Sequence, residues 1–183
     1  MQHEQDLQVL RSAASPSKKP DRTALFECLV RTEKSNLAIS RSDLSETAAS
    51  RLKKSLTGSW QLVYTTGTVD TQDVTGKKGN YFPIKAVQSF DCEAGVIKNG
   101  IYIGAFCVLQ FGGDFDIVDA RKGAACRVVF DFDRLLLLSL FDISIGGERK
   151  EDKDRPFFSW ILCDDKIATA RGKGGGLALW KRI

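Results

Sequence analysis

This 183-residue chain contains a single histidine, His3. It lies in a polar N-terminal stretch that we expect to be loose. Catalytic sets of the Ser-His-Asp or Cys-His type need a histidine beside their nucleophile. The composition therefore argues against catalysis of that kind.

Cysteine is also scarce and irregularly placed. The count is odd, and no pair has a C-x-x-C spacing; the five positions are 28, 92, 107, 126 and 163. A disulfide framework or a zinc site needs paired or clustered cysteines. We expect free, buried thiols in a reducing compartment, and no bound metal.

Long apolar runs are absent too. The longest candidate, Leu135–Phe141, is far shorter than the roughly 20 residues of a membrane-spanning helix, so we expect no transmembrane segment. The net charge of +4 is too small to suggest a nucleic-acid-binding stripe. The N-terminus lacks the apolar region of a secretory signal, and the early Glu4 and Asp6 do not suit a transit peptide.

Residues 1–56 have a helical pattern and form a first segment, which we expect to pack on the rest of the chain. One helix is predicted at 21–35, beginning after Pro20. A second is predicted at 43–56, where leucines and an alanine recur every four residues and Ser42 or Asp43 would cap the first turn.

Residues 57–183 form the second segment, a succession of short β-branched and aromatic runs separated by Gly, Asn and Asp. Without intervening helices, such strands pair antiparallel, and a sheet this large closes to remove its edges. We therefore predict a mainly β fold, a closed antiparallel lipocalin-like β-barrel preceded by two α-helices. The predicted strands are 59–66, 82–90, 95–103, 105–111, 114–120, 125–133, 134–143, 157–163, 165–171 and 176–182.

Alternation along these strands predicts which side chains face inward. Three sets of apolar residues each share one face: Trp60, Leu62 and Tyr64; Val128, Phe130 and Phe132; and Phe158, Trp160 and Leu162. The strand at 134–143 is apolar on both faces, so we expect the N-terminal helices to cover its outer side.

Two patterns that suggest other functions have simpler explanations. The glycine-rich segment Arg171–Gly176 lacks the Lys-Ser/Thr pair and the following helix of a phosphate-binding loop, so it reads as a hairpin turn. Several aspartates could suggest a metal site, but those that flank Phe115 and Phe132 face away from these rings, toward a solvated outer face. The aspartates are Asp114, Asp116, Asp119, Asp131 and Asp133.

Three motifs carry a family resemblance. Gly58–Thr66 reads GSWQLVYTT, Tyr81–Phe90 is followed by Val96–Gly100, and Ala168–Trp180 contains an R-G-x-G-G hairpin. In this order they resemble the plastid lipid-associated protein (PAP/fibrillin) family, which is similar to lipocalins in fold. Lys173 departs from the pattern, because many members carry an acidic residue there.

The resemblance implies that Trp60 closes the base of a barrel with an arginine from a late strand over its indole ring, for which Arg171 and Arg182 are the candidates. It also implies a plastid protein at plastoglobules or thylakoids, a hydrophobic ligand such as a prenylquinone, carotenoid or acyl lipid, no cofactor and no catalysis. The residues expected to line the ligand site are Trp60, Leu62, Tyr64, Phe90, Phe111, Phe130, Phe132 and Trp160.

Two alternatives stay open. The aromatic residues could fill the barrel, leaving a structural protein that coats a lipid droplet or membrane, or docks on an enzyme of lipid metabolism. A calycin-like enzyme would need an inward acid or base, for which only Tyr64, Tyr102, a carboxylate or a cysteine is available.

Overall fold

A computed structural model of the chain describes residues 2–17, 19–42, 48–68, 72, 79–118, 126–145 and 154–183. It contains three helices, α1 (Gln2–Ala14), α2 (Arg22–Ser42) and α3 (Ala48–Leu56). The strands are β1 (Gly58–Thr65), β2 (Asn80–Tyr81), β3 (Lys85–Asp91), β4 (Val96–Ile103), β5 (Phe106–Val118), β6 (Arg127–Leu137), β7 (Phe141–Ser144), β8 (Phe157–Cys163), β9 (Ile167–Gly172) and β10 (Leu177–Arg182). The mainly β prediction is confirmed.

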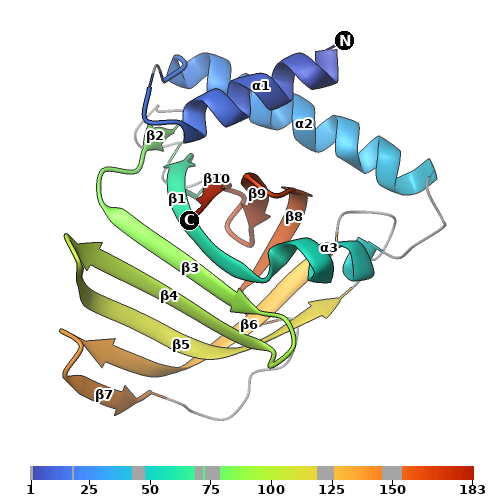
Figure 1. The fold of residues 1–183 in the computed structure, drawn as a ribbon. Coiled ribbons are helices and arrows are strands. Elements are labelled where there is room, and N and C mark those ends of the chain that lie inside the picture. Colours follow the sequence, from blue (N-terminus) through green and yellow to red (C-terminus); the bar gives the residue numbers. More distant parts are fainter. Residues whose placement is uncertain are drawn as a thin grey trace.

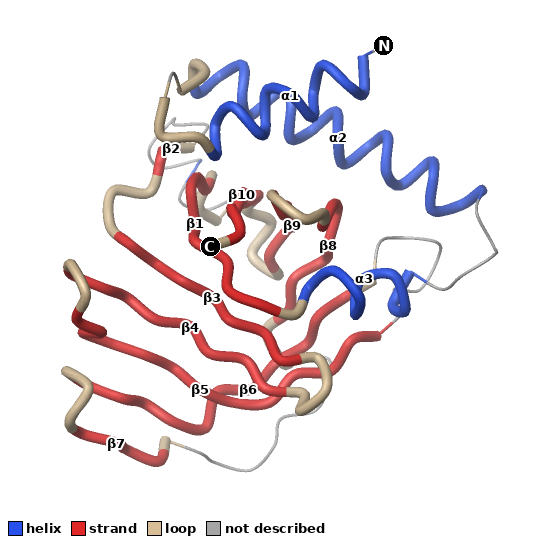
Figure 2. Tube along the Cα trace, viewed as in Figure 1, coloured by secondary structure: helices blue, strands red, loops and turns tan. Residues whose placement is uncertain are grey.

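The strands form one large antiparallel sheet whose pairings run in a ring. The order is β10-β9-β8-β6-β5-β4-β3-β1, and β1 also pairs with β10 (Figures 1 and 2). The contact between β6 and β8 is the shortest of these, three residue pairs from Arg127–Ser159 to Val129–Phe157. The strands β2 and β7 lie off the ring and pair with β1 and β6.

Two helices lie together on one side of the sheet, while α3 lies apart from them (Figure 1). The contacts of α1 are with β9 and β10, those of α2 are with β8, and those of α3 are with β5 and β8. The predicted start of α2 is correct: the Asp21 carboxylate accepts the amide of Thr23 at 2.8 Å and caps the helix.

Three helices instead of two precede the sheet, so that prediction was wrong in number. Helix α1 occupies the stretch around His3 that the sequence suggested was loose. It is held there because Leu10 and Ala13 are fully buried and the buried Asp6 carboxylate accepts the Arg31 guanidinium of α2 at 2.9 Å. Residues 43–47, where the second predicted helix and its Asp43 cap would begin, lie outside the described part of the chain.

Several strand boundaries also differ. The two strands predicted at 105–111 and 114–120 are one long strand, β5, as far as it is described. The predicted break at 133/134 is a bulge inside β6, and the chain turns only after Leu137. Residues 119–120 and 125 lie outside the described residues.

The core is divided into two parts by the ring of strands. The interior cluster lies inside the ring and has a buried set from α3, from eight strands and from Cys126 just before β6: Leu52, Leu56, Trp60, Phe90, Ile97, Phe115, Cys126, Val128, Phe130, Trp160, Ala168, Ala170 and Trp180. The helix-side cluster joins α1 and α2 to the outer face of β1, β9 and β10: Leu10, Ala13, Leu25, Cys28, Leu29, Val63, Tyr64, Ile167, Leu177 and Leu179. The helices therefore cover those strands, and β6 and β7 are not among them.

Candidate functional site

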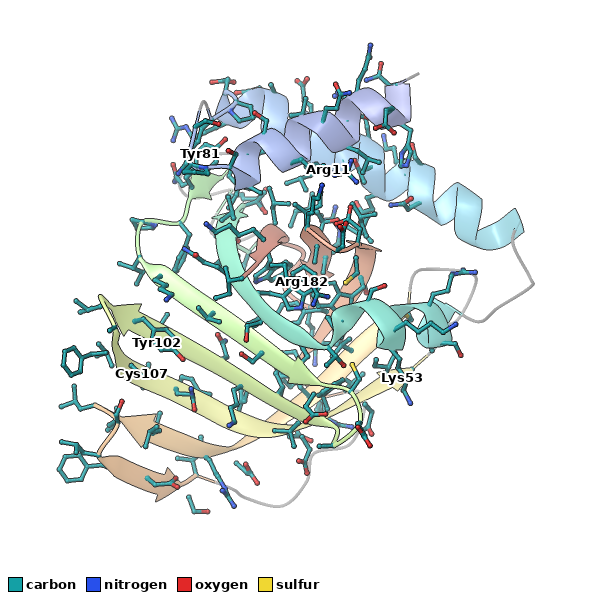
Figure 3. All side chains as sticks on the ribbon, viewed as in Figure 1. Arg11, Lys53, Tyr81, Tyr102, Cys107 and Arg182 are labelled. Carbon is teal, nitrogen blue, oxygen red and sulfur yellow. The ribbon has the colours of Figure 1, made fainter. Side chains whose placement is uncertain are left out.

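The floor of the interior cluster is built around Trp60. The Arg182 guanidinium lies over the indole ring, 4.5 Å from its centroid. The indole N–H donates to the Leu56 carbonyl at 2.8 Å, and Arg182 donates to the carbonyls of Thr57, at 3.0 Å, and Ser55. An arginine that binds the last carbonyls of a helix satisfies groups without an intrahelical partner, so Arg182 fixes α3 across this end of the ring (Figure 3).

Arg171 does not take part in this closure, which corrects one of the two predicted arginines. It lies on the helix-covered face of β9 together with Ile167 and Thr169, and its guanidinium binds the Glu33 carboxylate of α2 at 2.5 and 2.7 Å. Alternation along the two strands explains why Arg182 and not Arg171 lies over Trp60. Arg182 follows the inward Trp180 by two residues and shares its face, whereas Arg171 directly follows the inward Ala170 and faces the other side.

Above the floor, aromatic rings follow one another through the interior. Six ring pairs with centroids 5.1–5.8 Å apart link Phe90 to Trp160, Trp160 to Trp180, Trp180 to Phe158, Phe158 to Phe130, Phe130 to Phe132, and Phe132 to Phe111. Tilted and edge-on contacts at this spacing are favourable beyond the area they bury. Seven of the predicted lining residues therefore lie together: Trp60, Leu62, Phe90, Phe111, Phe130, Phe132 and Trp160.

Tyr64 is the exception, and its prediction was wrong. A bulge between Leu62 and Tyr64 adds one residue to β1, so alternation is shifted and both Val63 and Tyr64 turn to the helix side. The Tyr64 hydroxyl donates to the Arg22 carbonyl of α2 at 3.3 Å, and burial raises the pKa of its phenol to about 12. A similar bulge in β8 places Leu162 on that side as well.

Beyond Phe132 the inner face of the sheet continues as apolar but half-exposed surface. Directly paired residues share a face, so the pairings Leu135–Phe111, Leu137–Leu109 and Leu109–Ile101 extend the inner side over β6, β5 and β4. Phe141 and Ile143 of β7 pair with Leu137 and Leu135 and prolong it to the edge. We call this surface the inner apolar face: Ile101, Leu109, Phe111, Leu135, Leu137, Phe141 and Ile143. The sequence missed it, because it depends on the bulge at Asp133.

Besides Nε of Arg182 at the floor, two polar atoms in this interior have no hydrogen-bond partner among the described residues. They are Oε1 of Gln88, which is 7 % exposed, and Nε1 of Trp160, which is 3 % exposed. Gln88 is inward because it pairs with Trp60 on one side and Asn99 on the other. Buried polar atoms are normally satisfied, so these two offer an acceptor and a donor to a bound molecule.

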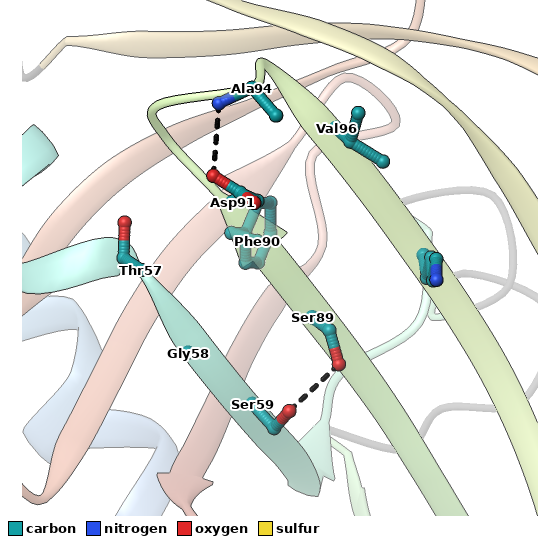
Figure 4. Close-up of a pocket in the computed structure, with 9 residues that line it drawn as sticks. Thr57, Gly58, Ser59, Ser89, Phe90, Asp91, Ala94 and Val96 are labelled. Carbon is teal, nitrogen blue, oxygen red and sulfur yellow. Dashed lines mark hydrogen bonds between the residues drawn. The ribbon is translucent and has the colours of Figure 1, made fainter.

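A hollow of about 370 Å³ lies at the start of β1 and the turn between β3 and β4 (Figure 4). The hydroxyls of Ser59 and Ser89 bind each other there at 2.8 Å, the Asp91 carboxylate accepts hydrogen bonds from the amides of Glu93 and Ala94, and Lys98 also lines the hollow.

Three of the groups considered for a calycin-like enzyme, Tyr102, Cys28 and Cys163, lie on the outer face of the sheet or have a raised pKa. Tyr102 pairs with Lys85, whose ammonium lies 5.4 Å from the centre of its ring, on the outer face of β3 and β4. Burial raises the pKa of both the Cys28 and Cys163 thiols to about 12, so they stay protonated at neutral pH. No group of three or more His, Cys, Asp or Glu residues within the described ranges could hold a metal ion, and Asp119 lies outside those ranges.

Neither a protein-family model nor a curated protein matches this chain. The resemblance to the PAP/fibrillin family thus stays a prediction that rests on three motifs. Among the described helices, none has both the length and the apolar character needed to cross a membrane.

Proposed function

We propose that this protein is a non-catalytic carrier or store for an elongated apolar molecule, a prenylquinone, carotenoid or acyl lipid, in plastids. In this proposal the ring of strands acts as a closed, lipocalin-like barrel of the PAP/fibrillin type. The observation that carries it is the inner apolar face, which begins at Phe132 of the interior cluster and is only half covered by protein. Removing such surface from water is favourable by about 25 cal/mol per Å².

The floor and the inner face have different roles in this proposal. The aromatic rings between Trp60 and Phe130 contact one another and fill the closed end, so the ligand chain lies on the inner apolar face above them. Gln88 Oε1, which lacks a partner among the described residues, accepts a hydrogen bond from a hydroxyl group of the ligand.

Adjacent leucines of β6 provide a matched test. Leu135 lies on the inner apolar face, while Leu136 pairs with Gln110 on the outer face, and both are half-buried. We expect the protein to take up an apolar naphthylamine fluorophore with saturation. Leu135→Asp should weaken uptake by more than about tenfold, because a carboxylate cannot be buried against the probe, whereas Leu136→Asp should bind as the parent does.

Circular dichroism of both variants confirms that the chains compared are folded. Equal uptake by the two aspartate variants, or no saturable uptake by the parent, would contradict the proposal.

The second candidate is a structural protein with a solid interior, located at the surface of a lipid droplet or thylakoid or docked on a lipid-metabolism enzyme. The chain of ring contacts from Phe90 to Phe111 favours it, because these side chains already fill part of the ring. It predicts that the protein takes up no apolar probe.

A further inference from the structure

Two neighbouring hairpins end in exposed apolar side chains. The β4–β5 turn carries Ile103, 68 % exposed, and Phe106, 79 % exposed. The β6–β7 turn carries Leu138, Leu140 and Phe141, which are 59, 77 and 61 % exposed. We call these five residues the hairpin tip. Large apolar side chains gathered at one exposed place mark an interaction site more often than single ones do.

The two hairpins are fixed to each other and not independently placed. The Leu138 amide donates to the Val108 carbonyl at 2.9 Å, and the Ser139 hydroxyl donates to the Cys107 carbonyl at 3.1 Å. Both turns project at the same edge of the sheet, away from the helices (Figure 1). The outer cover that the sequence suggested for residues 134–143 is absent from the described residues, because α1 and α2 contact β8, β9 and β10.

The second turn holds its leucines outward in an uncommon conformation. Leu138 and Ser139 have φ angles of 52° and 57°, a region that bulky L residues rarely adopt. Glycine or asparagine would fit such a turn with less strain. Leu138 thus presents a large apolar side chain to solvent from a position that favours a smaller residue.

We infer that the hairpin tip inserts into the apolar layer of a surface of neutral glycerolipids, from which the ligand reaches the inner apolar face. This inference rests on the proposed function and adds the element through which the protein meets its lipid source. The occupant follows from three properties of the tip.

The first property is the lack of charge. The sequences of 103–109 and 135–141 contain no charged residue, and their one hydroxyl side chain, Ser139, is bonded within the tip. Protein interfaces carry a polar rim and anchors such as Arg, Tyr and Trp. The five residues of the hairpin tip include no Arg, Tyr or Trp anchor, and the acyl region of a lipid layer requires none.

The second property is that backbone amides of the β6–β7 turn find their partners within the two hairpins. The Leu140 amide donates to the Leu137 carbonyl at 3.0 Å, in addition to the bond from Leu138 to Val108. An inserted segment must satisfy its polar groups without water, since none is present in the hydrocarbon region. A hairpin tip bonded in this way can enter lipid without exposing these donors.

The third property is continuity with the proposed ligand site. Phe141 pairs with Leu137, and Ile103 and Phe106 pair with each other two residues beyond Ile101, so the tip borders the inner apolar face. An apolar molecule could pass from a lipid layer to Phe111 and Phe132 along contiguous apolar side chains.

Flotation with vesicles of phosphatidylcholine tests this inference. We expect the parent to float, equally well with added phosphatidylglycerol and in high salt, because insertion of apolar groups does not depend on charge. Phe106→Ser combined with Leu140→Ser should lower partitioning by more than about tenfold for each side chain replaced.

The matched control replaces two other exposed apolar side chains, Val118→Ser with Ile183→Ser, which are 41 and 56 % exposed and lie away from the tip. The control should float as the parent does. Failure of the parent to float, equal flotation of the tip variant, or dimers of the parent that the tip substitutions dissociate without lipid would each overturn the inference. Fluorophore uptake in solution is measured separately, so it shows whether the proposed function survives a failed flotation.

Discussion

At the scale of single residues, the arrangement of Arg182, Trp60 and α3 explains how one end of the ring is closed. The guanidinium lies over the indole and bonds to two carbonyls at the end of α3, so one side chain links β10, β1 and the helix. A planar guanidinium stacks on the ring and presents a fixed fork of donors to both carbonyls, whereas the ammonium of lysine is a compact charge without that fork.

We therefore predict that Arg182→Lys lowers the free energy of unfolding by about 1–2 kcal/mol through the lost stacking and carbonyl bonds. Urea unfolding followed by tryptophan fluorescence measures the change, with Arg134→Lys at an exposed position of β6 as the control. Equal stability of Arg182→Lys and the parent would show that Arg182 does not hold α3 in place.

At the scale of elements, the sequence predicted most strands and most of their inward side chains, and it failed where a bulge intervenes. Trp60, Phe130 and Trp160 lie inside as alternation required, because no bulge precedes them in their strands. Tyr64 and Leu162 follow bulges, and each extra residue reverses the expected face. Such bulges depend on pairing with a distant strand, which a single sequence does not reveal.

The helices show the same limit. The segment of α1 is largely polar, and only Leu10 and Ala13 among its apolar residues are fully buried, so its pattern is weak in the sequence. Its position depends on contacts with β9, β10 and the Arg31 guanidinium of α2, far along the chain. Tertiary packing, more than helix propensity, stabilises such a helix.

Two groups of the helix-side cluster, Cys28 and Tyr64, and one beside the interior cluster, Cys163, should make stability sensitive to alkaline pH. Burial raises the pKa of Cys28 from 9.0 and that of Tyr64 from 10.0 to about 12 each, and Cys163 in β8 rises from 9.0 to about 12. Above pH 9 the unfolded chain loses these protons before the folded chain does, so stability falls as pH rises toward 12. Each group contributes at most about 1.4 kcal/mol per pH unit.

Urea unfolding between pH 8 and about pH 11, within the window set by these shifts, measures this slope. Cys28→Ala with Cys163→Ala should reduce it from pH 9 upward, and Tyr64→Phe only above pH 10, because the unfolded groups titrate there. If the free energy of unfolding fell equally with pH in the parent and in both variants, these three groups would not be the source of the pH dependence.

At the scale of the whole molecule, the ring of strands has a filled end and an apolar end. Helix α3, Trp60 and the aromatic rings occupy the first, whereas the second leads over half-exposed leucines to the hairpin tip. The composition and spacing of the strands predicted the antiparallel sheet, but the tip could not be predicted. From the sequence alone, the apolar run at 135–141 suggests a buried strand. The structure shows that α1 and α2 contact β8, β9 and β10 and so do not cover this run.

Native mass spectrometry of the protein mixed with a long-chain prenylquinone, a carotenoid or a free fatty acid tests the central claim most directly. We predict that at least one of these forms a complex of one molecule per chain, and that Leu135→Asp loses it while Leu136→Asp retains it. A folded parent protein that forms no such complex with any of the three would contradict the account.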